Sequence, residues 1–111
     1  MKLNANPIYR TLDWLWRLII KAGKDRCEIC GSKDVLECHH IITRGDYWLR
    51  WEPKNGVIAC RKCHERPAKI LAWLEEKDPK RYWWLIEQRA KTHQGQRIDL
   101  EAIERNLNNV L

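Results

Sequence analysis

Four of the five cysteines form two pairs of identical spacing, Cys27-x2-Cys30 and Cys60-x2-Cys63. A two-residue gap lets both sulfurs of a pair face one centre about 2.3 Å away, the Zn–S distance of a tetrahedral site. The alternatives are two disulfides or buried free thiols. Disulfides are typical of secreted chains, whereas this chain has an odd cysteine count and no recognisable export signal. We therefore predict a structural Zn²⁺ bound by four thiolates, and we interpret Cys38 as a small buried hydrophobe.

Three of the four histidines, His39, His40 and His64, lie between the cysteine pairs or directly after them, and Asn55 lies in the same segment. Two histidines at the end of a strand, an asparagine at the start of the next strand and a histidine opening a helix could converge on one point. Neutral imidazoles bind divalent metals and can accept a proton near neutral pH. We predict a metal-and-base site here. Coincidence is the alternative, and an ordinary loop side chain is our interpretation of the isolated His93.

The hydrophobic pattern predicts an α+β chain with short strands. In chain order it indicates a loose basic lead-in over 1–10, a helix over 11–22, strands over 35–42 and 56–59, a helix from about 67, a helix over 79–91 and a last helix after residue 99. Asp78 and Asp99 are good cap residues, and proline at 67 and 79 fits a first helical turn. With 111 residues we expect a single domain, composed of a basic arm and helix (1–24), a zinc-stapled core (25–66) and C-terminal helices (67–111).

The charge balance favours an anionic partner. The chain has 21 Lys and Arg side chains against 15 acidic ones, a net charge of +6. The first 26 residues hold six basic and two acidic side chains, so the excess is concentrated there. No apolar run is long enough to span a membrane, and we expect a cytoplasmic protein without a membrane partner.

Seven tryptophans and three tyrosines argue against disorder. Five tryptophans fall on helix patterns and are expected to pack: Trp14, Trp16, Trp73, Trp83 and Trp84. Because the adjacent Trp83 and Trp84 cannot both face one core, one of them would mark a partner or homodimer surface. Tyr47, Trp48 and Trp51 could stack on nucleic-acid bases, although a place in the core is favoured for Trp51.

Three motifs carry a resemblance to a known family: Glu37-Cys38-His39-His40-Ile41, Asn55-Gly56-Val57 and Cys60-x2-Cys63-His64. They resemble the HNH endonucleases of the ββα-metal (His-Me finger) class, in the subtype stapled by a four-cysteine zinc. The resemblance covers about residues 26–66. The run Arg50-Trp51-Glu52-Pro53-x-Asn55-Gly56-Val57 and the helical tail are similar to phage HNH proteins, including NinG-type recombination endonucleases.

The resemblance implies a role for each matching position. His39 and His64 would bind a catalytic divalent metal, His40 would be the general base for the attacking water, and Asn55 would brace the loop and orient the base. Some family members have a further histidine one helical turn beyond His64, where this chain has Ala68. Two protein ligands would leave places for water and phosphate, which suits Mg²⁺ or Mn²⁺ better than Ni²⁺ or Zn²⁺.

The implied activity is metal-dependent hydrolysis of DNA phosphodiester bonds, by a phage-encoded enzyme in the bacterial host cytoplasm. Arg44, Arg61 and Arg66 could bind phosphate, and an ordinary surface charge is the alternative for each of them. Phage packaging or recombination proteins would be the protein partners. The rival hypothesis is a non-catalytic, zinc-dependent nucleic-acid-binding or adaptor module. Such a module would not need the set of three histidines and one asparagine.

Overall fold

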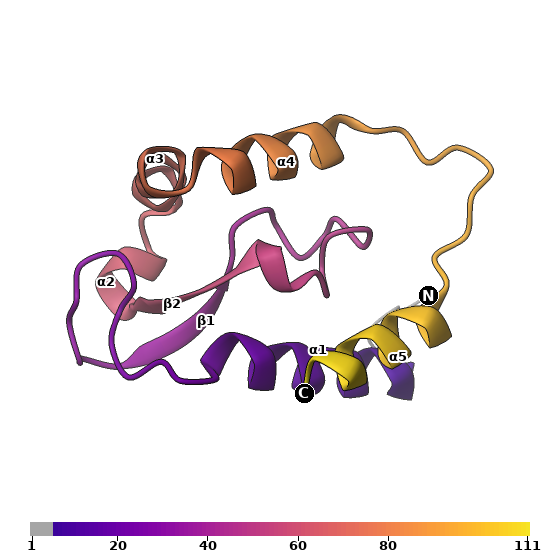
Figure 1. The fold of residues 1–111 in the computed structure, drawn as a ribbon, viewed down its shortest axis with the longest axis horizontal. Helices are drawn as coiled ribbons and strands as arrows, with labels where there is room; N and C mark the ends of the chain where they lie inside the picture. The colour runs from indigo at the N-terminus through magenta and orange to yellow at the C-terminus, as the bar shows by residue number, and fades with distance from the viewer. Residues whose placement is uncertain (1–5) are drawn as a thin grey trace.

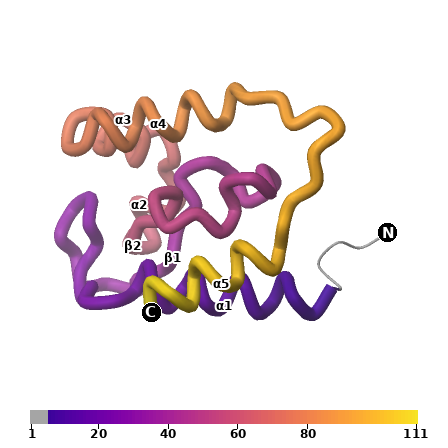
Figure 2. Tube along the Cα trace, turned by 45° about the vertical axis from the view of Figure 1, so that its right-hand side comes forward, coloured from indigo at the N-terminus to yellow at the C-terminus, as the bar shows by residue number. Residues whose placement is uncertain are grey.

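The computed structural model describes residues 6–111 and has helices on both faces of a two-stranded antiparallel sheet (Figure 1). The elements in chain order are α1 (Pro7–Lys21), β1 (Leu36–His40), the 3₁₀ helix η2 (Pro53–Asn55), β2 (Gly56–Cys60), α2 (Arg61–His64), α3 (Pro67–Lys77), α4 (Pro79–Ala90) and α5 (Leu100–Val110). Helices α1 and α5 lie side by side below the sheet in Figures 1 and 2, and α3 and α4 lie above it. The predicted α+β class, with a small two-stranded core and flanking helices, is confirmed.

Two apolar clusters, one on each face, hold this arrangement together. All five residues of β2 are buried, and successive side chains of a strand point to opposite faces. Val57 and Ala59 therefore join the cluster between the sheet and helices α3 and α4. Ile58 joins the cluster between the sheet and helices α1 and α5. Coverage on both faces explains why β2 is a continuous apolar run in the sequence.

Helix α1 begins four residues earlier than predicted, so the expectation of a loose lead-in up to residue 10 is wrong for its last part. The Asn6 side chain accepts a hydrogen bond from the Ile8 backbone N–H (3.1 Å), and Pro7 occupies the first helical turn. Both are ordinary helix-start signals. The earlier part of the lead-in, with Lys2, lies outside the described residues.

The C-terminal helices start where the sequence predicts. Asp78 and Asp99 accept hydrogen bonds from the backbone N–H groups of Arg81 (3.2 Å) and Ala102 (3.0 Å). The side chains that these helices bury most completely are Ile70, Leu74, Leu85 and Leu107. Within the described residues, every helix is too short or too polar to span a bilayer.

Of the five helical tryptophans, Trp14 does not pack as expected, whereas the exposure of Trp83 agrees with the prediction that one of the adjacent Trp83 and Trp84 faces outward. Trp14 is 55% exposed and Trp83 is 56% exposed, whereas Trp16 and Trp51 are buried. The reason is helical geometry: Trp14 lies about 200° around α1 from the buried Trp16. Trp83 lies about 200° around α4 from the buried Leu85, so it also points to solvent.

Gly56 lets α1 approach the sheet closely, and it gives a test of this packing. A Cβ at position 56 would lie 2.6 Å from Trp16 Cζ2 and would overlap the Ile20 side chain. We expect Gly56→Ala to lower the free energy of unfolding by about 1–3 kcal/mol through overpacking, measured by urea or thermal denaturation. Gly45→Ala is the control, because its Cβ would meet only Thr43 Oγ1 at 3.8 Å. Equal stability of the two variants would contradict this account of how α1 is seated.

Candidate functional site

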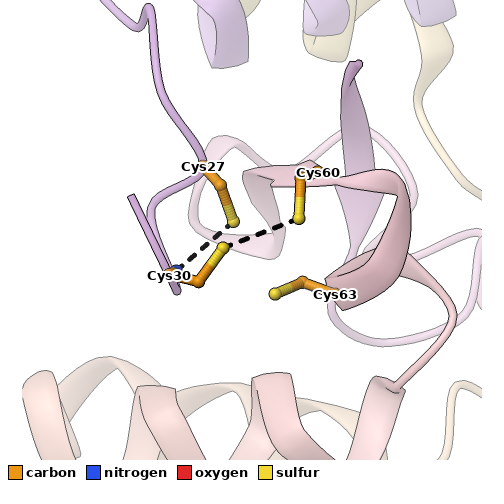
Figure 3. A group of neighbouring side chains, drawn as sticks. All are labelled: Cys27, Cys30, Cys60 and Cys63. Atoms are coloured by element: carbon orange, nitrogen blue, oxygen red, sulfur yellow. Dashed lines mark hydrogen bonds between the residues drawn. The ribbon is translucent and has the colours of Figure 1, made fainter. Parts of the chain in front are cut away.

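The four paired cysteines converge on one point at the end of the sheet (Figure 3). Cys27 and Cys30 come from the loop after α1, Cys60 ends β2, and Cys63 lies on α2. Their sulfurs all lie within 4.8 Å of one another, and none of them forms a disulfide. The structure therefore does not contain the two disulfides that were the alternative to a zinc site.

The geometry of this cluster fits a tetrahedral zinc. Two sulfurs bound to one zinc at about 2.3 Å lie roughly 3.8 Å apart, and Cys30 Sγ lies 3.6 Å from Cys60 Sγ. Burial and the neighbouring cysteine sulfurs raise the pKa of Cys63 to about 12. Although burial opposes it, hydrogen bonding from the backbone of Cys30, Cys60 and Ile29 lowers the pKa of Cys27 to about 6. Thiols crowded in this way ionise together only when a cation balances them.

Backbone contacts tie the first cysteine pair to the sheet. Gly31, at φ +78°, turns the loop so that its N–H donates to the Cys27 carbonyl (2.9 Å). The Glu28 N–H donates to the Ile58 carbonyl (2.9 Å), and the Glu28 carboxylate accepts from the Ile58 N–H (2.8 Å). Glu28 therefore binds the outer edge of β2 with its backbone N–H and its side-chain carboxylate.

At the opposite end of β1 from Leu36, two adjacent histidines lie on opposite faces of the sheet. His39 is opposite Val57 and His40 is opposite Gly56 in the register. Both line one cleft of about 460 Å³ between α1, the end of β1, the following loop and α2. The cleft is lined by Trp16, Arg17, Cys38, His39, His40, Ile41, Thr43, Arg44, His64 and Pro67.

His39 and His64 meet as a pair on the α2 side of the cleft. Their Nδ1 atoms are 3.2 Å apart and their rings are nearly perpendicular, at 88°. Two nitrogens bound to one ion at about 2.1 Å lie roughly 3.0–3.4 Å apart, so the pair fits two ligands of a shared metal. Burial and the charges of His64 and His40 lower the pKa of His39 to about 4, which keeps it neutral as a ligand must be. The Glu37 carboxylate lies 3.6 Å from His64 Nδ1.

His40 is fixed in position and in tautomer. Its ring stacks on Trp16 (centroids 4.0 Å apart, planes at 5°), and its Nε2 lies 2.8 Å from the Arg50 carbonyl oxygen. Because a carbonyl only accepts, Nε2 carries the proton and Nδ1 of the neutral ring has a free lone pair. Burial and the charges of Arg50 and Arg44 lower the pKa of His40, against the opposing Arg50 carbonyl and Asp13. A neutral imidazole with an available nitrogen can act as a base.

Asn55 braces the loop that follows β1. It is fully buried, and its side-chain amide makes three hydrogen bonds across that loop. The carbonyl oxygen accepts from the Ile42 N–H (2.7 Å), and the NH₂ group donates to the carbonyls of Ile42 and Leu49 (3.0 Å each). Asn55 therefore fixes both ends of the turn that precedes Arg50, whose carbonyl holds His40.

A buried ion pair holds Arg50 itself. The Arg50 guanidinium donates to both oxygens of Asp13 on α1, at 3.0 and 2.8 Å, and the Trp51 indole donates to the same carboxylate (2.8 Å). Burial alone would raise the pKa of Asp13. The hydrogen bonds from Arg50 and Trp51, together with the charges of Arg50 and Arg17, outweigh burial and lower that pKa. The Trp16 indole donates to the Glu52 carbonyl (2.9 Å). Helix α1 thus anchors both the carbonyl and the ring that contact His40.

The three arginines singled out from the sequence are not brought together. Arg44 lines the histidine cleft, whereas Arg66 lies in a separate hollow beside Cys30, Cys60 and Cys63. Arg61 opens α2 and lines neither of these hollows.

Cys38 differs from its prediction, because it is half-buried and lines the histidine cleft. Its Sγ is 3.8 Å from the Arg17 carbonyl on α1. Its position follows from the strand alternation that also places His40 on the α1 face of the sheet.

The sequence alone predicted no place at the histidine site for Trp16, Arg17, Glu37, Asp13 or the Arg50 side chain. A period of two along β1 places Glu37 on the same face as His39, and this signal could have identified it. The other four act through contacts between α1 and residues 38–51, and local spacing carries no information on such contacts.

Among the residues that the structure describes, the four cysteines are the only group of three or more potential metal ligands gathered together. The histidine pair therefore offers two ligands to an ion. This agrees with Ala68, which lies where some HNH endonucleases have a further histidine. Residues 27–68 match the family model described as HNH endonuclease. No curated protein and no solved structure matches the chain.

Proposed function

We propose that this protein is a metal-dependent endonuclease that hydrolyses DNA phosphodiester bonds. One observation carries the proposal: the His39–His64 nitrogen pair and the oriented base His40 line the same cleft. The two parts supply complementary chemistry, because a base can take the proton of the attacking water and a bound cation can neutralise charge on the phosphate. The match of residues 27–68 to the HNH endonuclease model adds support.

In the proposed mechanism His40 Nδ1 takes the proton of the attacking water. The Arg50 carbonyl then accepts from Nε2–H of the imidazolium, and Asp13 lies near enough to favour that positive charge. Trp16 keeps the ring plane fixed, and Asn55 holds the loop that carries the Arg50 carbonyl. His39 and His64 would hold a divalent cation, which would supply positive charge for the scissile phosphate and the leaving oxygen.

We further propose Mg²⁺ or Mn²⁺ as the catalytic ion, because a site with two protein ligands leaves room for several waters. Imidazole ligands also suit Ni²⁺ and Zn²⁺, so these two ions belong in any assay. The resemblance of the 50–57 run and the helical tail to phage HNH proteins supports a role in phage DNA packaging, recombination or processing.

A plasmid-cleavage assay tests the function directly. Zinc-loaded protein is incubated with supercoiled plasmid and Mg²⁺, Mn²⁺, Ni²⁺ or Zn²⁺ in turn, and nicked and linear products are separated on a gel. We expect cleavage with at least Mg²⁺ or Mn²⁺. If the folded, zinc-containing protein binds the plasmid but cuts it with none of these ions, the non-catalytic module replaces this proposal.

The metal ligands should have a recognisable phenotype. We expect His39→Ala and His64→Ala to weaken binding of the catalytic ion by about 10-fold or more, because each variant removes one of the two protein ligands. Raising the Mn²⁺ concentration should restore part of the cleavage rate, measured as a metal titration. His93→Ala, which lies outside the cleft, is the control and should titrate like the wild type. A ligand variant with unchanged metal dependence would remove that histidine from the metal site.

A further inference from the structure

The outer face of α1 has a row of four exposed side chains, Arg10, Trp14, Arg17 and Lys21, which we call the α1 stripe. Their spacing of four, three and four residues keeps them on one side of a helix. At 1.5 Å per residue the stripe is roughly 16 Å long. Trp14 lies in the row with one cation before it and two after it.

The three cations of the stripe are not held in ion pairs with carboxylates within the described part of the chain. The one acid within α1, Asp13, is bound to Arg50 and Trp51 instead. A solvent-exposed indole between unpaired cations contributes nothing to the core. The stripe has the composition of a nucleic-acid-binding surface, in which cations contact phosphates and an aromatic ring stacks on a base.

The stripe borders the histidine cleft at Arg17, the third of its four residues. Arg17 lines that cleft, and its carbonyl lies 3.8 Å from Cys38 Sγ beside His39 and His40. Arg44 lines the same cleft from the loop after β1. A DNA strand in the cleft at Arg17 would therefore extend along α1 in both directions, toward Lys21 at one end of the stripe and toward Arg10 at the other.

We propose that the α1 stripe binds the DNA strand that enters the cleft. The three cations take successive phosphates, and Trp14 packs against a sugar or stacks on a base. This inference rests on the proposed function, because that function makes DNA the occupant of the cleft. Positive charge and one aromatic face favour a nucleic acid as the partner, and the proposed activity of the cleft selects DNA.

The test measures binding without cleavage. His40→Ala protein, loaded with zinc and without added catalytic metal, is titrated into fluorescently labelled 20-nucleotide DNA, single-stranded or duplex, at several salt concentrations. Arg10→Ala/Lys21→Ala should bind about tenfold more weakly and lower the salt slope of duplex binding by roughly 1.8, since each phosphate contact contributes about 0.9. Lys77→Ala/Arg89→Ala is the matched control. It also removes one arginine and one lysine from exposed helix positions, and should bind several-fold more tightly than the stripe variant.

Trp14→Ala should weaken binding by about fivefold or more, as expected for the loss of one stacking contact. Its control is Trp83→Ala, which removes an equally exposed indole from α4. A loss with single-stranded DNA only identifies a base as the contact, and an equal loss with duplex identifies a sugar. Equal affinities of the stripe variants and their controls, or tighter binding of RNA of the same sequence, would overturn the proposal.

These outcomes are separable from the failure of the nuclease activity. If the wild type cuts plasmid and the stripe variants bind like their controls, the endonuclease stands and the α1 stripe falls. If the wild type cuts nothing while the stripe variants lose DNA binding, the stripe stands and the activity falls.

Discussion

His40→Ala is expected to reduce DNA cleavage by about 10²–10⁴-fold, the usual contribution of a general base. The loss should be in the rate at saturating metal, because His40 contacts the Arg50 carbonyl and Trp16 and is not one of the two proposed ligands. Added Mn²⁺ or Mg²⁺ should therefore restore nothing. This behaviour distinguishes a base from the two ligands, whose variants respond to metal.

The same variant should keep its fold, its zinc and most of its DNA binding. The cysteines hold the zinc, and neither Arg17 nor Arg44 forms an ion pair that depends on this imidazole. Zinc content by elemental analysis, circular dichroism and fluorescence anisotropy measure the three properties. Cleavage by His40→Ala at the wild-type rate under saturating metal would refute its assignment as the base.

Cys30→Ala is expected to abolish zinc binding and to unfold most of the chain. Structural zinc contributes about 10–16 kcal/mol in small peptide sites, which is as large as the 5–15 kcal/mol that stabilises a typical domain. Cys30 is the most informative of the four because it is the exposed one, so its truncation removes little core packing. Any unfolding then reports the loss of the metal.

Cys38→Ala is the control, since Cys38 is half-buried and lies outside the cluster. It should retain one zinc per chain and a cooperative melting transition, measured by elemental analysis and calorimetry. A wild-type protein that contained no zinc and still melted cooperatively would refute the structural role of the cluster.

The sequence predicts best those features that depend on neighbours in the chain. The caps at Asp78 and Asp99 and the prolines at 67 and 79 act within one helical turn, and each helix begins there. The cysteine spacing works in the same way, because each pair is set by a local turn. The start of α1 at Pro7 had equally local signals in Asn6 and Pro7, which the charged and polar composition of the lead-in obscured.

What could not be predicted is the support behind the histidines. Trp16 stacks on a ring 24 positions later in the chain, and Asp13 binds a guanidinium 37 positions later. Such contacts depend on how α1 is seated on the sheet, which Gly56 permits by having no side chain. Periodicity placed Trp16 inside correctly, but only the packed structure shows that its neighbour there is His40.

Cys63 and His64 are adjacent residues of the four-residue helix α2: Cys63 belongs to the cysteine cluster, and His64 is one of the two proposed ligands of the catalytic ion. Because of this adjacency, the proposed catalytic site would depend on the zinc site, but not the reverse. Loss of the ion at the histidine pair would leave the cysteine cluster and the orientation of α2 unchanged. Loss of zinc would free α2, and His64 would then move away from His39. Under the proposed function, a newly made chain would therefore cut no DNA until it had bound zinc, and the supply of zinc would set the number of active copies.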